Sequence, residues 1–114
     1  MLEARILKRR HLIYYLEVHD QENGELIGHV VDITTLGMKL VSRQALPVGR
    51  VYHLRMSLPG EHFREKDIRF TAQALWSSND VNPDFYDTGF EVSLMDERAK
   101  DIIVQLINRL GFND

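Results

Sequence analysis

Apolar and polar residues alternate along several short stretches of the chain, which is the pattern of strands with one buried face. The clearest stretch is Val51–Leu58, where every second residue from Tyr52 onward is apolar. Stretches rich in Gly, Pro, Asn and Asp separate these runs and are typical of turns. The pattern predicts six strands, at Leu12–Val18, Leu26–Asp32, Met38–Val41, Val51–Leu58, Ile68–Trp76 and Gly89–Ser93.

The connections between these runs favour an antiparallel arrangement. Asn23-Gly24 stands between the first two runs, and Asn-Gly in that position is the strongest short-range signal for a hairpin. Pro59-Gly60 ends the fourth run, and the residues of 61–67 and 77–88 are polar enough to be solvated loops. Because no helix interrupts the strands, the sequence predicts an all-β-dominated fold, a six-stranded antiparallel split barrel.

Helical periodicity is confined to the C-terminus. Asp96 is a natural N-cap, and Gly111 followed by Phe112 resembles a helix stop with its apolar contact. The helix between them has to bury an apolar stripe on the barrel or on a partner. That stripe consists of Ala99, Ile102, Ile103, Val104, Leu106, Ile107 and Leu110.

Length and composition indicate one soluble domain. The chain has 114 residues, of which 44% are hydrophobic and 27% charged, and this is an ordinary globular composition. No apolar run reaches the roughly 18 to 20 residues of a membrane span, and no secretory signal begins the chain, so we expect a cytoplasmic protein without membrane insertion. Zero cysteines exclude disulfides, iron–sulfur clusters and thiolate zinc sites, and the five histidines lack metal-site spacing.

Charge is distributed unevenly. The net charge of −3 argues against DNA binding, which needs many Lys or Arg contacts to phosphates. Residues 1–11 nevertheless carry four cations against Glu3, so a segment of charge +3 precedes a body of charge −6. We therefore divide the chain into a flexible basic N-terminal segment, 1–11, and a barrel domain with its helix, 12–114. Such a segment favours a small anion over a duplex.

The basic segment places Arg5 and Arg9 four positions apart, with Arg10 next in the chain. Arginine suits a phosphodiester and also the O6/N7 edge and flat face of guanine, because its planar fork donates in pairs and stacks. Without further evidence, such a segment is an ordinary solvated terminus.

A second group, Asp32, Thr34 and Gly37, stands at the end of the second predicted strand. A carboxylate there can accept hydrogen bonds from the N1–H and N2–H₂ edge of guanine, and a hydroxyl can bind nearby. Glycine at position 37 permits a backbone φ above zero. The plain alternative is a turn, in which Asp, Thr and Gly are common.

Together the two groups resemble the PilZ domain, a bacterial receptor module for cyclic di-GMP. That family is marked by two arginines separated by three residues, followed about two dozen positions later by Asp or Asn, any residue, Ser, two residues and Gly. Arg5 and Arg9 match the arginine pair. Asp32, Thr34 and Gly37 match the second motif, with Thr34 retaining the hydroxyl of the usual Ser. The barrel and C-terminal helix of the family agree with the periodicity.

The resemblance implies how the ligand is held. The flexible arginine segment folds over cyclic di-GMP on the outer surface of the barrel, and its ordering changes what the domain presents to a partner. Asp32 and Thr34 hold one guanine, while Arg5 and Arg9 clamp phosphate and the Hoogsteen edge. Arg10 can take over part of the role of Arg9, because it lies closer to the first strand. Whether one nucleotide or an intercalated pair binds stays open.

Trp76 has two interpretations. Some members of the family place an aromatic residue against a base at this point, which makes Trp76 a candidate ligand contact. Trp76 also continues the apolar face of its strand, which favours a place in the core.

The stretch after Trp76 contains a pattern similar to a calcium loop. Its positions one, three, five and twelve are occupied by Asp80, Asn82, Asp84 and Glu91. Phe85 stands where such a loop needs Gly, and strands flank it in place of helices. We therefore interpret the stretch as a turn, with Phe85 and Tyr86 against the barrel.

The sequence thus predicts a stand-alone receptor module, not an enzyme, that has no catalytic residues, cofactor or metal. It would bind cyclic di-GMP and act through a protein partner on motility, adhesion or biofilm. Its helix could serve that partner or self-association as a homodimer. The alternative is an adaptor of the same fold, without a nucleotide, in a pilus or motor assembly. A more distant alternative is a small barrel enzyme or flavin-binding barrel.

Overall fold

The computed structural model describes residues 16–60 and 63–110. The predicted basic segment lies outside these residues, and so do its three arginines, Arg5, Arg9 and Arg10. The predicted helix stop at Gly111 and Phe112 lies outside them as well.

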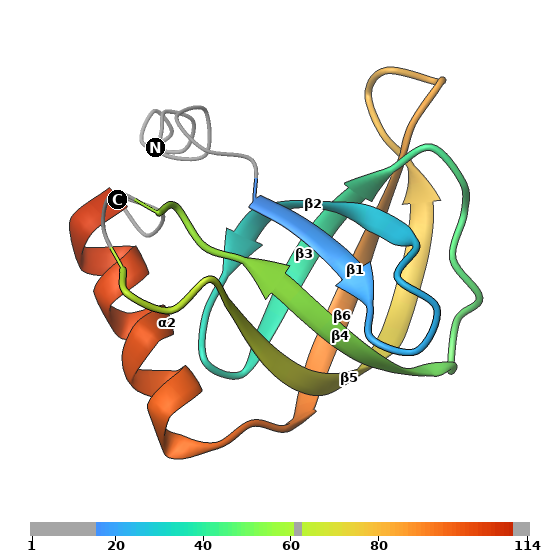
Figure 1. Cartoon of the computed structure of the whole chain (residues 1–114). Coiled ribbons are helices and arrows are strands. Elements are labelled where there is room, and N and C mark those ends of the chain that lie inside the picture. Colours follow the sequence, from blue (N-terminus) through green and yellow to red (C-terminus); the bar gives the residue numbers. More distant parts are fainter. Residues whose placement is uncertain (1–15, 61–62, 111–114) are drawn as a thin grey trace.

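Six antiparallel strands form a closed barrel in the order β1-β2-β3-β6-β5-β4 (Figure 1). The first hairpin is the predicted one: Gly24 has a φ of 76°, which suits glycine, and its N–H donates to the Asp20 carbonyl at 2.9 Å. The prediction of a six-stranded antiparallel barrel is confirmed. The strands are β1 (Leu16–Asp20), β2 (Leu26–Ile33), β3 (Gly37–Ser42), β4 (Val51–Ser57), β5 (Asp67–Asn79) and β6 (Tyr86–Leu94).

The predicted alternation fills the barrel interior. On β4, Tyr52, Leu54 and Met56 are buried while the residues between them face outward. Every second residue of β5 from Ile68 to Ala74 is buried in the same way. This inward set and the apolar stripe of the helix form one continuous core, so burial of apolar surface holds the barrel and the helix together.

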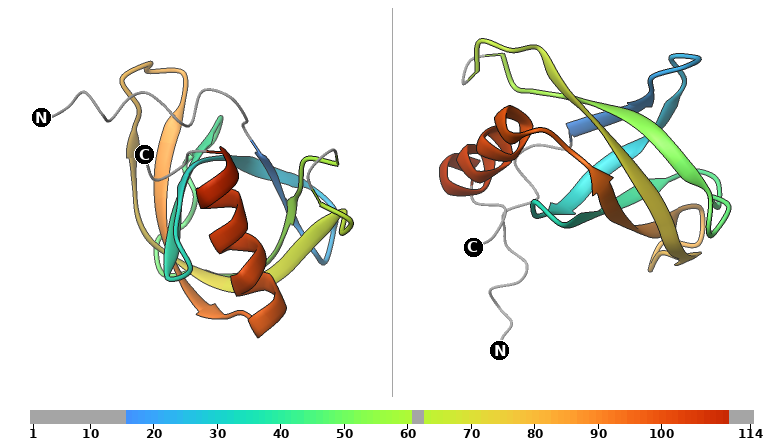
Figure 2. Two further views of the ribbon diagram at one scale, coloured as in Figure 1. Left: turned by 90° about the vertical axis from the view of Figure 1, so that its left-hand side faces the viewer. Right: turned by 90° about the horizontal axis from the view of Figure 1, so that it is seen from below.

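Helix α2 (Glu97–Leu110) lies across one end of the barrel (Figure 2). Its N-cap is the predicted one, because the Asp96 Oδ1 accepts a hydrogen bond from the Ala99 N–H at 2.8 Å. Ala99, Ile102, Ile103 and Leu106 are buried as expected. The prediction for Val104 is wrong: it is 47% exposed, because it lies about 100° around the helix from Ile103 and off the buried stripe.

The interpretation of 77–88 as a loop is wrong at both ends. Strand β5 continues to Asn79 and β6 begins at Tyr86, which leaves 80–85 as the connection. The polar residues here are paired rather than solvated, since the Ser77 and Thr88 hydroxyls lie 2.9 Å apart and Thr88 is fully buried. Asn82 shapes the turn as expected, accepting from the Asp84 N–H at 3.0 Å.

Among the described residues, the structure contains no helix of the length and apolarity needed to span a membrane.

Candidate functional site

Four residues from four strands form one row across the outer wall of the barrel. Asp32 on β2 pairs with Lys39 on β3, Lys39 pairs with Gly89 on β6, and Gly89 pairs with Trp76 on β5. With strands about 4.8 Å apart, the row is about 14 Å long. It forms the floor of a shallow cavity of about 320 Å³, which Thr34 and Gly37 also line. The structure therefore brings Asp32, Thr34, Gly37 and Trp76 into one site.

Two β-bulges set the outward direction of the side chains at the ends of the row. The β5–β6 register shifts between Ala74 and Trp76, so Leu75 is the additional residue. Trp76 is consequently 46% exposed and does not occupy the inward position that strict alternation gives it. The interpretation of Trp76 as a core residue is wrong. A second shift, between Val30 and Asp32 on β2, leaves the Asp32 side chain exposed.

The indole of Trp76 lies directly over Gly89. A Cβ built on Gly89 would collide with the Nε1, Cε2 and Cζ2 atoms of the ring. Because position 89 has no side chain, the indole can lie on the barrel wall over Gly89. Gly89 is the neighbour of Lys39 in the row. Trp76 is the single tryptophan of the chain, so its fluorescence reports on this site alone.

The Thr34 hydroxyl organises the turn between β2 and β3. Its Oγ1 accepts hydrogen bonds from the Leu36 N–H at 3.1 Å and the Gly37 N–H at 3.2 Å. The Thr34 N–H in turn donates to the Gly37 carbonyl at 2.8 Å. The hydroxyl is thus engaged within the turn, which fixes the position of the strand end that carries Asp32.

The explanation predicted for Gly37 is wrong. Among the described residues, positive φ values occur at Gly24 and Gly49, and Gly37 has an ordinary strand conformation. Position 37 needs glycine for a different reason: a Cβ there would stand 2.6 Å from the carbonyl oxygen of Phe90 on β6. Close approach of two backbones, not an unusual φ, excludes a side chain at this position.

The two charges of the site are available to a ligand. No described residue donates a hydrogen bond to the Asp32 carboxylate or lies within ion-pair distance of it. The same part of the structure contains no ion pair of Lys39 either. A carboxylate, an ammonium group and an indole face thus lie along one wall. This combination suits a planar base that has N–H donors and an attached anionic group.

Two further carboxyl groups lie near Lys39. Burial raises the pKa of Asp87, and the neighbouring Asp80 carboxylate raises it further, while Lys39 opposes them. For Asp80, hydrogen bonds from the Asn82 and Val81 backbone and from Asp87 outweigh burial and lower the pKa. The pair therefore holds a proton more readily at Asp87, beside the cation of the site.

Replacing Asp87 by Asn is expected to stabilise the fold at neutral pH. Because the pKa of Asp87 is higher in the folded protein than in the unfolded chain, ionisation of Asp87 lowers the free energy of unfolding. This loss is absent below the unfolded pKa near 3.8 and is complete once the pH exceeds the folded pKa. The gain should be up to about 1 kcal/mol at pH 7, the range for partly exposed charge pairs. Urea unfolding at pH 7 and pH 3 measures it, with Asp84→Asn in the adjacent connection between β5 and β6 as control. An equal gain at both pH values would contradict this account.

Sequence reasoning did not find Lys39 or Gly89 as site residues. Lys39 stands two positions after Gly37 on an outward face, so alternation along β3 was an available signal. Nothing in the sequence marks Gly89 as the partner of Trp76, because that pairing depends on the register between β5 and β6. Arg5, Arg9 and Arg10 stay predictions, since they lie outside the described residues.

Comparison with known proteins identifies a family and a structure of similar fold. The PilZ domain model matches residues 8–109, a span that includes Arg9 and Arg10 and leaves out Arg5. The solved structure of the Bacillus subtilis inhibitor of motility (MotI/DgrA) is similar in fold, with a TM-score of 0.73 at 20% identity. The similarity covers 89% of this chain and 49% of that one, so the present chain spans about half its length. A search of curated proteins found no match.

Proposed function

The chain belongs to the PilZ domain family, and from that premise we propose that it is a non-enzymatic receptor for cyclic di-GMP. The observation that carries the proposal is the four-strand row, which joins the motif residue Asp32 to Lys39 and Trp76 in one cavity. A receptor for a messenger inside the cell acts in the cytoplasm, so a cytoplasmic location is part of the proposal.

Each side chain of the cavity has a role suited to its chemistry. The Asp32 carboxylate accepts from the N1–H and N2–H₂ groups of a guanine. The exposed face of Trp76 stacks on a base, which contributes about 1–3 kcal/mol in nucleic-acid complexes. Lys39 attracts a phosphodiester as a point charge. Thr34 acts mainly by holding the turn, because its hydroxyl is already engaged there.

The proposal assigns the remaining phosphate contacts to the arginines. Arg9 and Arg10 are both within the span matched by the family, which supports a role for either in clamping phosphate and the guanine edge. Arg5 is a weaker part of the proposal, since it precedes that span. Closure of this segment over the ligand would alter the surface offered to a protein partner.

Motility, adhesion or biofilm formation is the proposed output, through a protein partner. For motility, the support is the similar fold of an inhibitor of motility. The role of that whole protein is a guide only, because the present chain corresponds to about half of it.

Isothermal titration of the full chain with cyclic di-GMP tests the proposal. We expect saturable binding in the micromolar range, accompanied by a change in the fluorescence of Trp76. 5′-GMP serves as the matched control, because it has the base and a phosphate but lacks the second nucleotide. Absence of heat and of a fluorescence change would overturn the receptor proposal and leave the adaptor without a nucleotide.

Replacing Lys39 by Ala is expected to weaken cyclic di-GMP binding about two- to tenfold, the effect of losing a partly exposed charge contact. The dependence of affinity on salt should also become less steep, because salt screens charge pairs and one such pair with a phosphate is then missing. Titrations at several salt concentrations measure both effects. Lys66→Ala, which removes an exposed charge elsewhere, is the control. An unchanged salt dependence would exclude a phosphate contact of Lys39.

A further inference from the structure

The barrel has a second cavity at its other end. Helix α2 lies across one end (Figure 2), while the opposite end is formed by the β1–β2 hairpin, the end of β3 and the loop that follows it. The cavity there has a volume of about 770 Å³ and shares no lining residue with the cavity of Asp32 and Trp76. This volume is within the range of about 300–1,000 Å³ that is usual for small-molecule sites.

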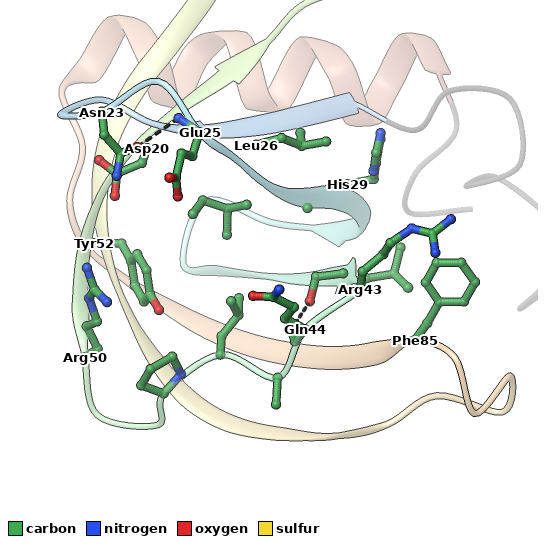
Figure 3. Close-up of a pocket in the computed structure, with 17 residues that line it drawn as sticks. Asp20, Asn23, Glu25, Leu26, His29, Arg43, Gln44, Arg50, Tyr52 and Phe85 are labelled. Atoms are coloured by element: carbon green, nitrogen blue, oxygen red, sulfur yellow. Dashed lines mark hydrogen bonds between the residues drawn. The ribbon is translucent and has the colours of Figure 1, made fainter.

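The hydroxyl of a largely buried tyrosine points into this cavity. Tyr52 is only 4% exposed, and its hydroxyl makes no hydrogen bond to any described residue. Figure 3 shows the hydroxyl directed into the cavity. Burial raises the pKa of Tyr52, with Asp20 adding to the effect and Arg50 opposing it, so the phenol stays protonated at neutral pH. The hydroxyl is open to the cavity and not fully enclosed, so a ligand that pairs with it replaces water at this position.

Asp20 is a second buried polar group of the same wall. It is 6% exposed, and its Oδ1 accepts a hydrogen bond from the Glu22 N–H at 2.7 Å. No described residue donates to its other oxygen. Glu25 lies beside it and is directed into the same cavity (Figure 3). This side of the cavity therefore offers two carboxylates and the Tyr52 hydroxyl as acceptors for an ammonium group, against one guanidinium, that of Arg50, which lies over the Tyr52 ring.

The opposite side of the cavity is basic. The Arg43 guanidinium stands 5.3 Å from the centre of the Phe85 ring, and His29 lies on the same side (Figure 3). Among the described residues, no carboxylate forms an ion pair with Arg43. Stacking on the ring fixes the guanidinium while its edge N–H groups stay available to an anion. Apolar side chains, Leu46 and Pro47 among them, also line the cavity.

We propose that this end cavity binds a short peptide with free termini. The ammonium group of the peptide lies against Asp20, Glu25 and the Tyr52 hydroxyl, and its carboxylate lies against Arg43. The apolar side chains of the cavity contact the body of the peptide. One side carries two carboxylates against Arg50 and the other carries Arg43, and this difference in charge favours a molecule with a positive and a negative end over a simple anion.

Titration of the ¹⁵N-labelled full chain with trialanine, followed by NMR, tests this site. We expect saturable shifts of signals from the cavity, including those of Asp20, Arg43 and Tyr52. N-acetylation or C-terminal amidation of the peptide should each weaken binding at least about tenfold, because each removes a charge-assisted contact. Absence of saturable shifts, shifts located elsewhere, or equal binding of the doubly blocked peptide would overturn the proposal.

Tyr52→Phe is the decisive variant. It keeps the ring, and with it the contacts to Phe90 and Arg50, and removes only the hydroxyl that has no partner. The melting temperature should therefore stay nearly unchanged, while trialanine binding weakens. Asp20→Asn, which keeps the Oδ1 acceptor, should weaken binding further. Full peptide affinity in a well-folded Tyr52→Phe variant would contradict the assigned contact.

Asp32→Asn is the matched control, because it alters the other cavity. It should leave trialanine binding unchanged while it weakens cyclic di-GMP binding. The two proposals can therefore fail separately, since each ligand is measured on the same protein with variants of different cavities.

Discussion

Replacing Asp32 by Ala is expected to weaken cyclic di-GMP binding by roughly 1.5 to 3 kcal/mol, or about 10- to 150-fold, the usual effect of losing hydrogen bonds to a charged group. The carboxylate is exposed at the end of β2, and its removal breaks no hydrogen bond or ion pair with the described residues. Nearly the whole effect should therefore be in binding, with little change in the free energy of unfolding.

Isothermal titration and the fluorescence of Trp76 measure the loss, and thermal unfolding checks the fold. Asp101→Ala is the matched control, because it removes an exposed carboxylate from α2. The same titrations on Arg9→Ala and Arg10→Ala decide which arginine fills the second position of the pair; for Arg9 we expect a loss as large as that for Asp32. Wild type and the Asp32 variant binding equally well would refute the assigned guanine contact.

Much of the fold follows from local pattern. On β4 the alternation of Tyr52, Leu54 and Met56 with polar residues determines both the strand and its buried face, because one side of a barrel wall must be apolar. The Asn23-Gly24 turn and the Asp96 cap are local as well, since each depends on a few neighbouring residues. Features of this kind can be predicted from a single sequence.

Features that depend on contacts between strands could not be predicted in the same way. The bulge at Leu75 reverses the direction expected for Trp76, and a period of two contains no information about where a bulge occurs. Ser77 and Thr88 resemble loop residues in sequence, yet their hydroxyl groups form a hydrogen bond with each other between β5 and β6. Polar composition therefore underestimates the length of both strands.

The residues of the site also divide into those that a local motif predicts and those that depend on strand pairing. The motif located Asp32, Thr34 and Gly37, because they stand close together in the chain. Lys39 joins Asp32 through the register of β2 with β3, and Gly89 joins them through the register of β3 with β6, which pairs residues fifty positions apart. The motif also suggested a φ argument for Gly37, whereas the structure gives a steric one.

The close approach of Gly37 to the Phe90 carbonyl should make the stability of the fold sensitive to any side chain at position 37. Gly37→Ala is expected to lower the free energy of unfolding by about 1–3 kcal/mol, because its Cβ would meet the Phe90 carbonyl oxygen, a backbone atom that cannot rotate away. The melting temperature should fall by about 4–8 °C for each kcal/mol in a domain near this size. Urea and thermal unfolding measure both quantities.

Two other glycines separate this effect from the general consequences of a Gly→Ala change. At Gly60 a Cβ has no neighbour within 4 Å, so Gly60→Ala should be close to neutral. At Gly89 the colliding atoms belong to the exposed Trp76 side chain, which can swing aside at small cost to the fold. Gly89→Ala should therefore change the fluorescence of Trp76 and weaken ligand binding while the melting temperature falls less than in Gly37→Ala. Equal destabilisation by the three substitutions would show that loss of glycine itself, rather than the approach of β3 to β6, decides stability here.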